Sequence, residues 1–267
     1  MMKVDIKLVK QLRDMTKAPF KDVKDALEEA NGDLDKAIEI LKAKGAAKAA
    51  KKADRETKEG IVKVLEADEG VFGVKLWCET DFVAKNSMFL ELADTILQKV
   101  ASRWAFFNSW DDAPEDLKSE LTSLVQEYIG KIGENLKILD LFALRKEVPV
   151  YVYIHPGNRV VSLVFYKGDE KVAKEVALQV AAMNPSFKDI DSIPSEEFEN
   201  IKAKFREELA SSNKPADIIE KIIEGKLSKV FEEMVLEEQP YIRDDSKKMK
   251  DVMKDKIEVV EFKRFSI

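Results

Sequence analysis

The same order of predicted elements, strand, turn, strand, helix, occurs twice along the chain and limits the possible folds more than any other feature. Residues 61–65 and 71–77 have the pattern of a β-hairpin, and residues 89–100 then place apolar side chains at helical spacing. Residues 150–166 repeat the hairpin and residues 172–180 repeat the helix. We therefore predict an α+β fold with a core of two related subdomains, each made of antiparallel strands with packed helices.

The N-terminal segment, residues 1–45, contains three short groups of apolar residues at helical spacing. Pro19 suits a first helical turn, Asp33 a helix N-cap and Gly45 the end of the third helix. These features predict a three-helix bundle that resembles a ubiquitin-associated domain. A bundle of about 40 residues is near the lower limit for independent folding, so a surface buried against a partner would stabilise it.

The other domain boundaries follow from composition and pattern. Residues 46–58 are rich in Ala and Lys and have no apolar face, which predicts a solvated basic linker. RNA binding by its lysines is left open, although no aromatic residues are interleaved for base stacking. Core subdomain N is then expected at 59–147 and core subdomain C at 148–267, with a protruding helical hairpin inserted at about 194–238.

Composition excludes several classes of function. The 267 residues carry a formal net charge of −6, which argues against a general nucleic-acid binder. One cysteine, Cys78, and one histidine, His155, exclude an internal disulfide and a multi-histidine metal site. No apolar run reaches the roughly 18 residues that span a bilayer, and the N-terminus lacks the apolar region of a signal peptide. A cytoplasmic location is therefore expected.

Conventional catalysis has little support in the sequence. The phosphate-binding loop, the dinucleotide-binding motif, the nucleophile elbow and the zinc-protease motif are all absent, so we expect neither an enzyme nor a bound cofactor. His155 lies in the predicted hairpin turn, where it is either an exposed turn residue or a lone general base without a sequence-local partner.

Residues 79–86 depart from the surrounding pattern, because they place a large ring and a carboxylate in a predicted loop between a strand and a helix. Such a loop holds its side chains in position for contact with a partner. From the residues alone, Phe82 is either such a contact or a buried core ring, and Asp81 is either a contact or part of a helix cap. The aromatic cluster at 104–110 is expected to fill core space.

Several motifs occur in a fixed order over nearly the whole chain. They are LRDMTKA at 12–18, KDAL at 24–27, AAKKA at 49–53, TDFVAKN at 80–86, KIGEN at 131–135, EQP at 238–240 and FKRF at 262–265. In these motifs the chain resembles the elongation factor Ts family, the guanine-nucleotide exchange factors of the translational GTPase elongation factor Tu.

The resemblance implies a partner-binding surface and no covalent chemistry. It implies that the chain binds elongation factor Tu, does not bind nucleotide or membrane, and inserts Asp81 and Phe82 between helices of the GTPase, which disturbs the magnesium site. A higher-order assembly with the GTPase is left open. The implied contacts are Thr80, Asp81, Phe82 and Val83 at the magnesium site, His155 as a second contact, and Lys10, Arg13, Phe20, Ile132 and Gly133 on the bundle and core.

The chain departs from the family pattern in two places. Pro19 and Phe20 stand where glycine and methionine are common, and residues 155–161 read HPGNRVV where family members usually place glycine close before and shortly after the arginine. A second hypothesis, from another functional class, is a binding adaptor that uses the bundle and the helical hairpin as interaction modules.

Overall fold

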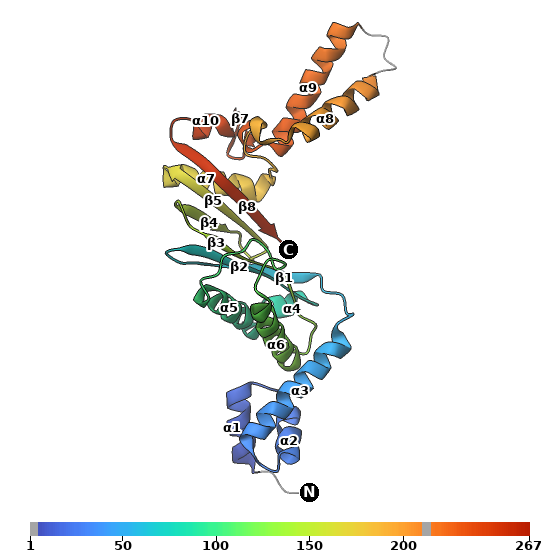
Figure 1. The fold of residues 1–267 in the computed structure, drawn as a ribbon, viewed down its shortest axis with the longest axis vertical. Helices are drawn as coiled ribbons and strands as arrows, with labels where there is room; N and C mark the ends of the chain where they lie inside the picture. The colour runs from blue at the N-terminus through green and yellow to red at the C-terminus, as the bar shows by residue number, and fades with distance from the viewer. Residues whose placement is uncertain (1–4, 210–214) are drawn as a thin grey trace. The chain divides into compact units, whose positions relative to one another are not determined.

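The computed structural model describes residues 5–209 and 215–267 and has the predicted α+β architecture (Figure 1). The chain divides into two compact units. The first unit comprises the chain up to Arg145 with residues 157–159 and 266–267, and the second comprises Lys146–Pro156 and Val160–Phe265.

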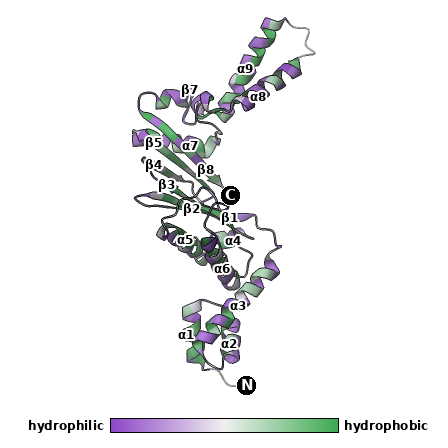
Figure 2. Cartoon of the chain, in the orientation of Figure 1, coloured by the Kyte–Doolittle hydropathy of each residue, from purple (hydrophilic) through white to green (hydrophobic). Residues whose placement is uncertain are grey.

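The first unit begins with the predicted bundle of three helices, α1 (Ile6–Thr16), α2 (Phe20–Glu29) and α3 (Leu34–Lys52). The carboxylates of Asp5 and Asp33 cap α1 and α3 by accepting hydrogen bonds from backbone N–H groups of the first turns. Figure 2 shows apolar and polar residues alternating along these helices, as expected for amphipathic helices that share one core. That core contains Val9, Leu12, Val23, Ala26, Leu27 and Ala37.

The prediction that the third helix ends at Gly45 is wrong, because α3 continues to Lys52. Gly45 is buried where α3 packs against α6 (Glu115–Ile132). A Cβ added to Gly130 of α6 would lie 3.0 Å from the Cα of Gly45, so the two helices approach at their backbones. Residues 46–52 of the predicted linker are therefore helical and packed, and the solvated segment is shorter than expected.

A three-stranded antiparallel sheet forms the centre of the first unit, in the order β1 (Glu59–Glu66), β2 (Gly70–Cys78), β3 (Lys137–Arg145). Helix α5 (Ser87–Ser102) packs against β1 and β2, and α6 packs against α5 (Figure 1). β1, β2 and α5 match predicted elements, whereas β3 does not. The core between them includes Phe72, Leu76, Phe89, Leu92, Leu121 and Leu141.

The second unit contains another three-stranded sheet, in the order β4 (Val150–Ile154), β5 (Val160–Gly168), β8 (Ile257–Ser266). Helix α7 (Glu170–Met183) packs against β4 and β5. The order β4, turn, β5, α7 repeats the order β1, turn, β2, α5, which confirms the predicted repeat. β8 completes this sheet near the C-terminal end of the chain.

Two helices, α8 (Ser195–Leu209) and α9 (Ala216–Met234), form the predicted hairpin, which projects from the sheet of the second unit in Figure 1. The rings of Phe198 and Phe231 stack between them with centroids 5.9 Å apart. Residues 210–214, between the two helices, lie outside the described residues. Shorter elements flank the hairpin: the 3₁₀ turns Ile190–Ser192 and Leu236–Glu238, the strands β6 (Pro240–Tyr241) and β7 (Asp244–Lys248), and the helix α10 (Met249–Met253).

The aromatic cluster at 104–110 fills core space only in part. Phe107 is buried and exchanges two backbone hydrogen bonds with Ala143 of β3, at 2.8 and 2.9 Å. Trp104, in contrast, is 61% exposed and has a left-handed backbone with φ of 52°. Core filling is therefore correct for Phe107 and wrong for Trp104.

Candidate functional site

The residues Thr80 to Val83, here called the tip, begin a short helix, α4 (Asp81–Ala84), and do not form the predicted loop. Thr80 is the N-cap, with an extended backbone (φ −126°, ψ 155°), and its Oγ1 accepts a hydrogen bond from the backbone N–H of Val83 at 3.4 Å. Ala84 is buried and Val83 packs against the core of the first unit. These two side chains anchor α4, so Asp81 and Phe82 are left at the surface.

The Phe82 side chain is 82% exposed. A phenylalanine ring that stays in water forgoes about 1.5–3 kcal/mol of burial free energy. The interpretation of Phe82 as a buried core ring is therefore wrong. An apolar ring that a capped helix holds in water is available for burial against a partner.

Asp81 lies beside this ring and carries a stable negative charge. Its Oδ2 accepts a hydrogen bond from Lys85 Nζ at 2.9 Å, and this bond lowers the pKa of the Asp81 carboxyl. The tip thus presents an apolar ring and an ionised carboxylate at neighbouring positions. The sequence left open whether Asp81 caps the helix, and the structure shows that Thr80 is the N-cap.

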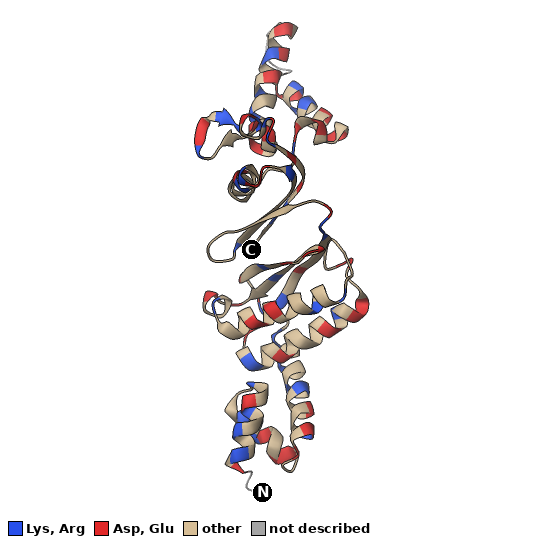
Figure 3. Cartoon of the chain, turned by 90° about the vertical axis from the view of Figure 1, so that its left-hand side faces the viewer, with Lys and Arg blue, Asp and Glu red and all other residues tan. Residues whose placement is uncertain are grey.

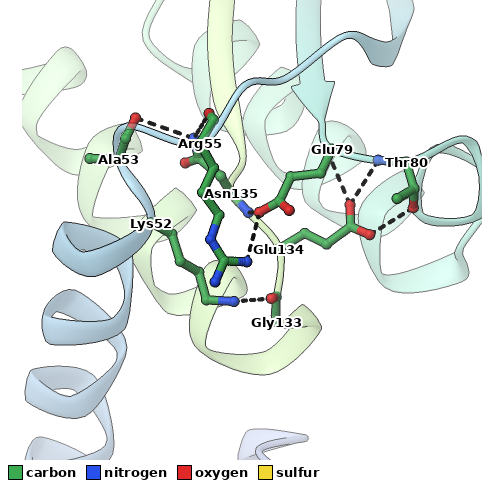
Figure 4. Close-up of polar contacts among 8 residues, drawn as sticks. All are labelled: Lys52, Ala53, Arg55, Glu79, Thr80, Gly133, Glu134 and Asn135. Carbon is green, nitrogen blue, oxygen red and sulfur yellow. Dashed lines mark hydrogen bonds and ion pairs between the residues drawn. The ribbon is translucent and has the colours of Figure 1, made fainter.

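Glu134 holds the start of α4 from a distant part of the sequence (Figure 4). Its Oε2 accepts hydrogen bonds from the backbone N–H groups of Glu79 (3.1 Å) and Thr80 (3.0 Å), and its Oε1 accepts one from Thr80 Oγ1 (2.6 Å). Glu134 directly follows Gly133, whose left-handed backbone, with φ of 91°, ends α6. One carboxylate therefore joins the turn after α6 to the tip.

Glu79 and Asn135 complete this connection in the reverse direction (Figure 4). Glu79 Oε1 accepts a hydrogen bond from the backbone N–H of Asn135 at 2.6 Å and lies 3.4 Å from Arg55 Nη1. Asn135 is 2% exposed, and its Nδ2 donates to the carbonyl oxygens of Arg55 (2.8 Å) and Ala53 (3.4 Å). The segment after α3, the tip and the turn after α6 therefore share one polar network.

Cys78 lies directly behind the tip. It is fully buried, and its Sγ donates a weak hydrogen bond to the Thr80 carbonyl oxygen at 3.2 Å. Burial, with a smaller contribution from the negative charges of Glu134 and Glu59, raises the pKa of the Cys78 thiol to about 12. The thiol is therefore neutral and structural.

His155, in the second unit, follows the last residue of β4 and is exposed. Its Nδ1 lies 3.0 Å from the hydroxyl of Tyr153, and its backbone N–H donates to the Val160 carbonyl oxygen at 2.9 Å. The ring is therefore held by a neighbour on the same strand and faces water. This environment fits a surface contact better than shielded proton transfer.

Ile132 and Gly133 lie at the end of α6, next to Glu134 in the chain. Ile132 is half-buried against the core of the first unit, and Gly133 is exposed. Glu134 follows Gly133 and accepts hydrogen bonds from Thr80, so the predicted contacts Ile132 and Gly133 lie near Thr80 in the structure.

The chain is similar to one protein family over most of its length. The family model described as elongation factor TS matches residues 79–267. Elongation factor Ts of Aquifex aeolicus (strain VF5) is 41% identical over 280 residues, covering 99% of this chain and 97% of the relative. The chain belongs to the elongation factor Ts family. Its Hydrogenobaculum sp. (strain Y04AAS1) member is 42% identical, covering 100% of this chain and 99% of the relative.

Membership of the elongation factor Ts family makes the chain a translation elongation factor. The matched region starts at Glu79, so it contains the tip, Glu134 and His155. The sequence missed the roles of Glu79, Glu134 and Asn135. Glu79 directly precedes the TDFVAKN motif, and Glu134 and Asn135 end the KIGEN motif, which was the available signal. Which side chain binds which backbone group depends on the fold.

The three predicted contacts on the bundle, Lys10, Arg13 and Phe20, are all exposed. Lys10 and Arg13 lie on α1, and Phe20, which is 55% exposed, is the first residue of α2. Ile6, on the same stripe of α1 as Lys10, is 80% exposed and was not singled out from the sequence. Ile6 is therefore a further exposed apolar side chain of the bundle.

Three lysines of α3 make intramolecular contacts. Lys44 pairs with Glu29 at 3.3 Å, Lys48 pairs with Asp22, and Lys52 donates to the Gly133 carbonyl oxygen. Figure 3 shows acidic and basic residues interspersed over this bundle. A mixed surface of this kind does not favour RNA binding.

Two kinds of site have no counterpart in the described part of the chain. Within 5–209 and 215–267, no three or more His, Cys, Asp or Glu side chains are grouped so that they could hold a metal ion. No helix among these residues has both the length and the apolar character of a membrane span.

Proposed function

We propose that this elongation factor binds elongation factor Tu loaded with GDP and promotes GDP release, after which GTP rebinds. In this proposal Asp81 and Phe82 insert near the magnesium and nucleotide site of the GTPase. The observation that carries the proposal is the 82% exposed ring of Phe82 on a capped helix, within the family motif. The chain itself needs neither covalent chemistry, a cofactor nor bound nucleotide.

The energetic basis is thermodynamic linkage. If the factor binds the empty GTPase more tightly than the GDP-loaded GTPase, bound GDP must weaken the factor by the same free energy. Each tenfold acceleration of release requires a barrier lower by about 1.4 kcal/mol. Burial of one exposed phenylalanine ring, at about 1.5–3 kcal/mol, supplies roughly one to two such steps.

The remaining predicted contacts are assigned to binding. Lys10, Arg13 and Phe20 offer charge and apolar surface on the bundle, and His155 offers an imidazole held by Tyr153. Several separate contacts on one chain raise the total affinity without altering the chemistry at any one of them. We assign the action on the nucleotide site to the tip and the affinity to the others.

The test is GDP release from elongation factor Tu loaded with a fluorescent GDP, chased with unlabelled nucleotide. Adding this protein is expected to increase the release rate in a saturable manner. Binding is measured in parallel on the same sample. If the two proteins bind and the release rate does not change, the exchange-factor proposal fails, and the adaptor hypothesis, with the bundle and the helical hairpin as interaction modules, takes its place.

A further inference from the structure

We propose that Glu134 is a positioning residue for Phe82: its carboxylate fixes the first turn of α4 in the orientation that GDP release requires. This inference rests on the proposed function. It concerns a side chain 52 positions away in the sequence from the ring that it positions, and Glu134 itself does not have to touch the partner.

The Glu134 carboxylate contacts both the backbone that enters α4 and the residue that caps it. A single carboxylate accepts from two successive backbone N–H groups, at 3.1 and 3.0 Å, and from the Thr80 hydroxyl at 2.6 Å. The Thr80 hydroxyl uses its hydrogen for Glu134 and its lone pair for the Val83 N–H. Glu134 therefore orients the group that caps α4 as well as the backbone that enters it.

Helix α4 has only four residues and needs support from outside the helix. A helix of four residues cannot hold itself together in water, because nucleation costs more than one turn of hydrogen bonds returns. Its own packing anchors are Val83 and Ala84, which follow Phe82. Glu134 adds a polar anchor before Phe82, next to the buried Cys78, so the ring is held from both sides.

The surroundings of Glu134 allow its side chain to be removed without unfolding the first unit. Glu134 is half-buried and Thr80 is exposed, so water can replace the lost acceptor if the carboxylate is removed. Glu79 and Asn135 keep their own hydrogen bond at 2.6 Å on the other side of the network. Removal of Glu134 is therefore expected to loosen the tip while the rest of the first unit stays folded.

The ordering of the tip has a direct kinetic consequence. A ring that samples many orientations must lose that freedom when it inserts, and the loss raises the barrier for GDP release. A ring already fixed by Glu134 avoids most of this cost. The positioning role predicts a change in the saturated release rate that disappears when the ring itself is absent.

The experiment compares Glu134→Ala, Glu134→Gln and the control Glu127→Ala at saturating protein in the GDP-release assay. Glu127 lies on the same helix α6 and pairs with Lys131 at 2.7 Å. We expect Glu134→Ala to slow stimulated release about tenfold, through the loss of charge-assisted hydrogen bonds to the tip. Glu134→Gln, whose amide oxygen can still accept from both N–H groups, should stay within about threefold, and Glu127→Ala should match the parent protein.

The same changes are made in a Phe82→Ala background to separate positioning from folding. If Glu134 acts through Phe82, Glu134→Ala has no further effect on release there. An undiminished effect in that background, or full activity of Glu134→Ala in the parent, overturns the proposal.

Amide hydrogen exchange of the free protein distinguishes failure of this inference from failure of the proposed function. Glu134→Ala should speed exchange of the Glu79 and Thr80 amides and leave the strand amides of β2 unchanged. If the parent protein does not stimulate release, the proposed function fails. Faster exchange of the Glu79 and Thr80 amides in Glu134→Ala would still support the positioning of the tip by Glu134. Unchanged exchange at both amides overturns it.

Discussion

Phe82 and Cys78 lie four positions apart and have opposite environments. Phe82 is 82% exposed, whereas Cys78 is 0% exposed. The last side chain of β2 points into the core, and the chain then turns outward through the Thr80 cap. The resemblance of the TDFVAKN motif to the family implied an exposed ring. The pattern of residues alone left the burial of Phe82 open, because an aromatic residue before a helix suits both environments.

Cys78 leads to a prediction about reactivity. Burial raises the pKa of its thiol from 9.0 to about 12, so the reactive thiolate is scarce even at pH 9. We expect a thiol reagent such as DTNB to label Cys78 only through opening of the structure, at a rate far below that of the unfolded protein. Below pH 9 the thiol is protonated in both states and does not affect stability.

Above pH 9 the unfolded chain loses the thiol proton first, because the folded pKa is the higher one, and the free energy of unfolding falls. Labelling is measured at pH 7, 8 and 9 with and without denaturant. Labelling of the native protein as fast as in denaturant would contradict the buried position of Cys78.

At the scale of elements, the sequence predicted the repeat but missed β3. Residues 137–145 combine a charged start with a nearly continuous apolar run, and such a run does not separate strand from helix. Long-range pairing decides the outcome, because β3 pairs with β2 through residues some 70 positions away. The end of α3 was misplaced for a similar reason, since Gly45 is a local stop signal that packing against Gly130 overrides.

The pairing of β2 and β3 leads to a prediction about packing. A Cβ on Gly73 would lie 1.9 Å from Phe142 Cζ, so the Phe142 ring occupies the space above the glycine. Gly73→Ala is expected to lower the free energy of unfolding by about 1–3 kcal/mol, through overpacking. Equilibrium denaturation by urea measures this change.

A matched control is Gly225→Ala in α9, where nothing lies within 4 Å of the added Cβ. It is expected to leave the stability unchanged or raise it by up to about 1 kcal/mol, because alanine favours helix. Combining Gly73→Ala with Phe142→Leu should recover part of the loss. Equal stability of Gly73→Ala and the parent protein would show that the ring does not fill this space.

At the scale of the whole molecule, α3 belongs to both the bundle and the body of the first unit. It packs with α2 in the bundle and with α6 in the body, and the segment after it enters the network of Asn135. The sequence indicated the bundle, the two subdomains and the hairpin, because each has its own local pattern. The network itself joins residues more than 50 positions apart, and no local pattern encodes such pairs.

The crossing of α3 and α6 leads to a prediction about affinity. A leucine at position 130 has no room beside the Cα of Gly45, so Gly130→Leu should release the bundle from α6. We expect the concentration for half-maximal stimulation of GDP release to rise about fivefold, because the bundle then contributes less to binding. The saturated rate should stay unchanged, since the tip is intact.

A titration of the release rate against protein concentration measures both quantities. Gly130→Ala, a smaller change at the same place, serves as the graded control. A lower saturated rate for Gly130→Leu, with the half-maximal concentration unchanged, would contradict the division between a binding bundle and an acting tip.

The central claim is that the exposed ring of Phe82 disturbs the nucleotide site, and one measurement tests it directly. The release rate of fluorescent GDP from elongation factor Tu is compared at saturating parent protein and at saturating Phe82→Ala, with Phe20→Ala, another exposed phenylalanine, as the control. We predict that Phe82→Ala is folded, binds, and stimulates release at least about tenfold less, whereas Phe20→Ala keeps the saturated rate. A saturated rate for Phe82→Ala equal to that of the parent protein would contradict the account.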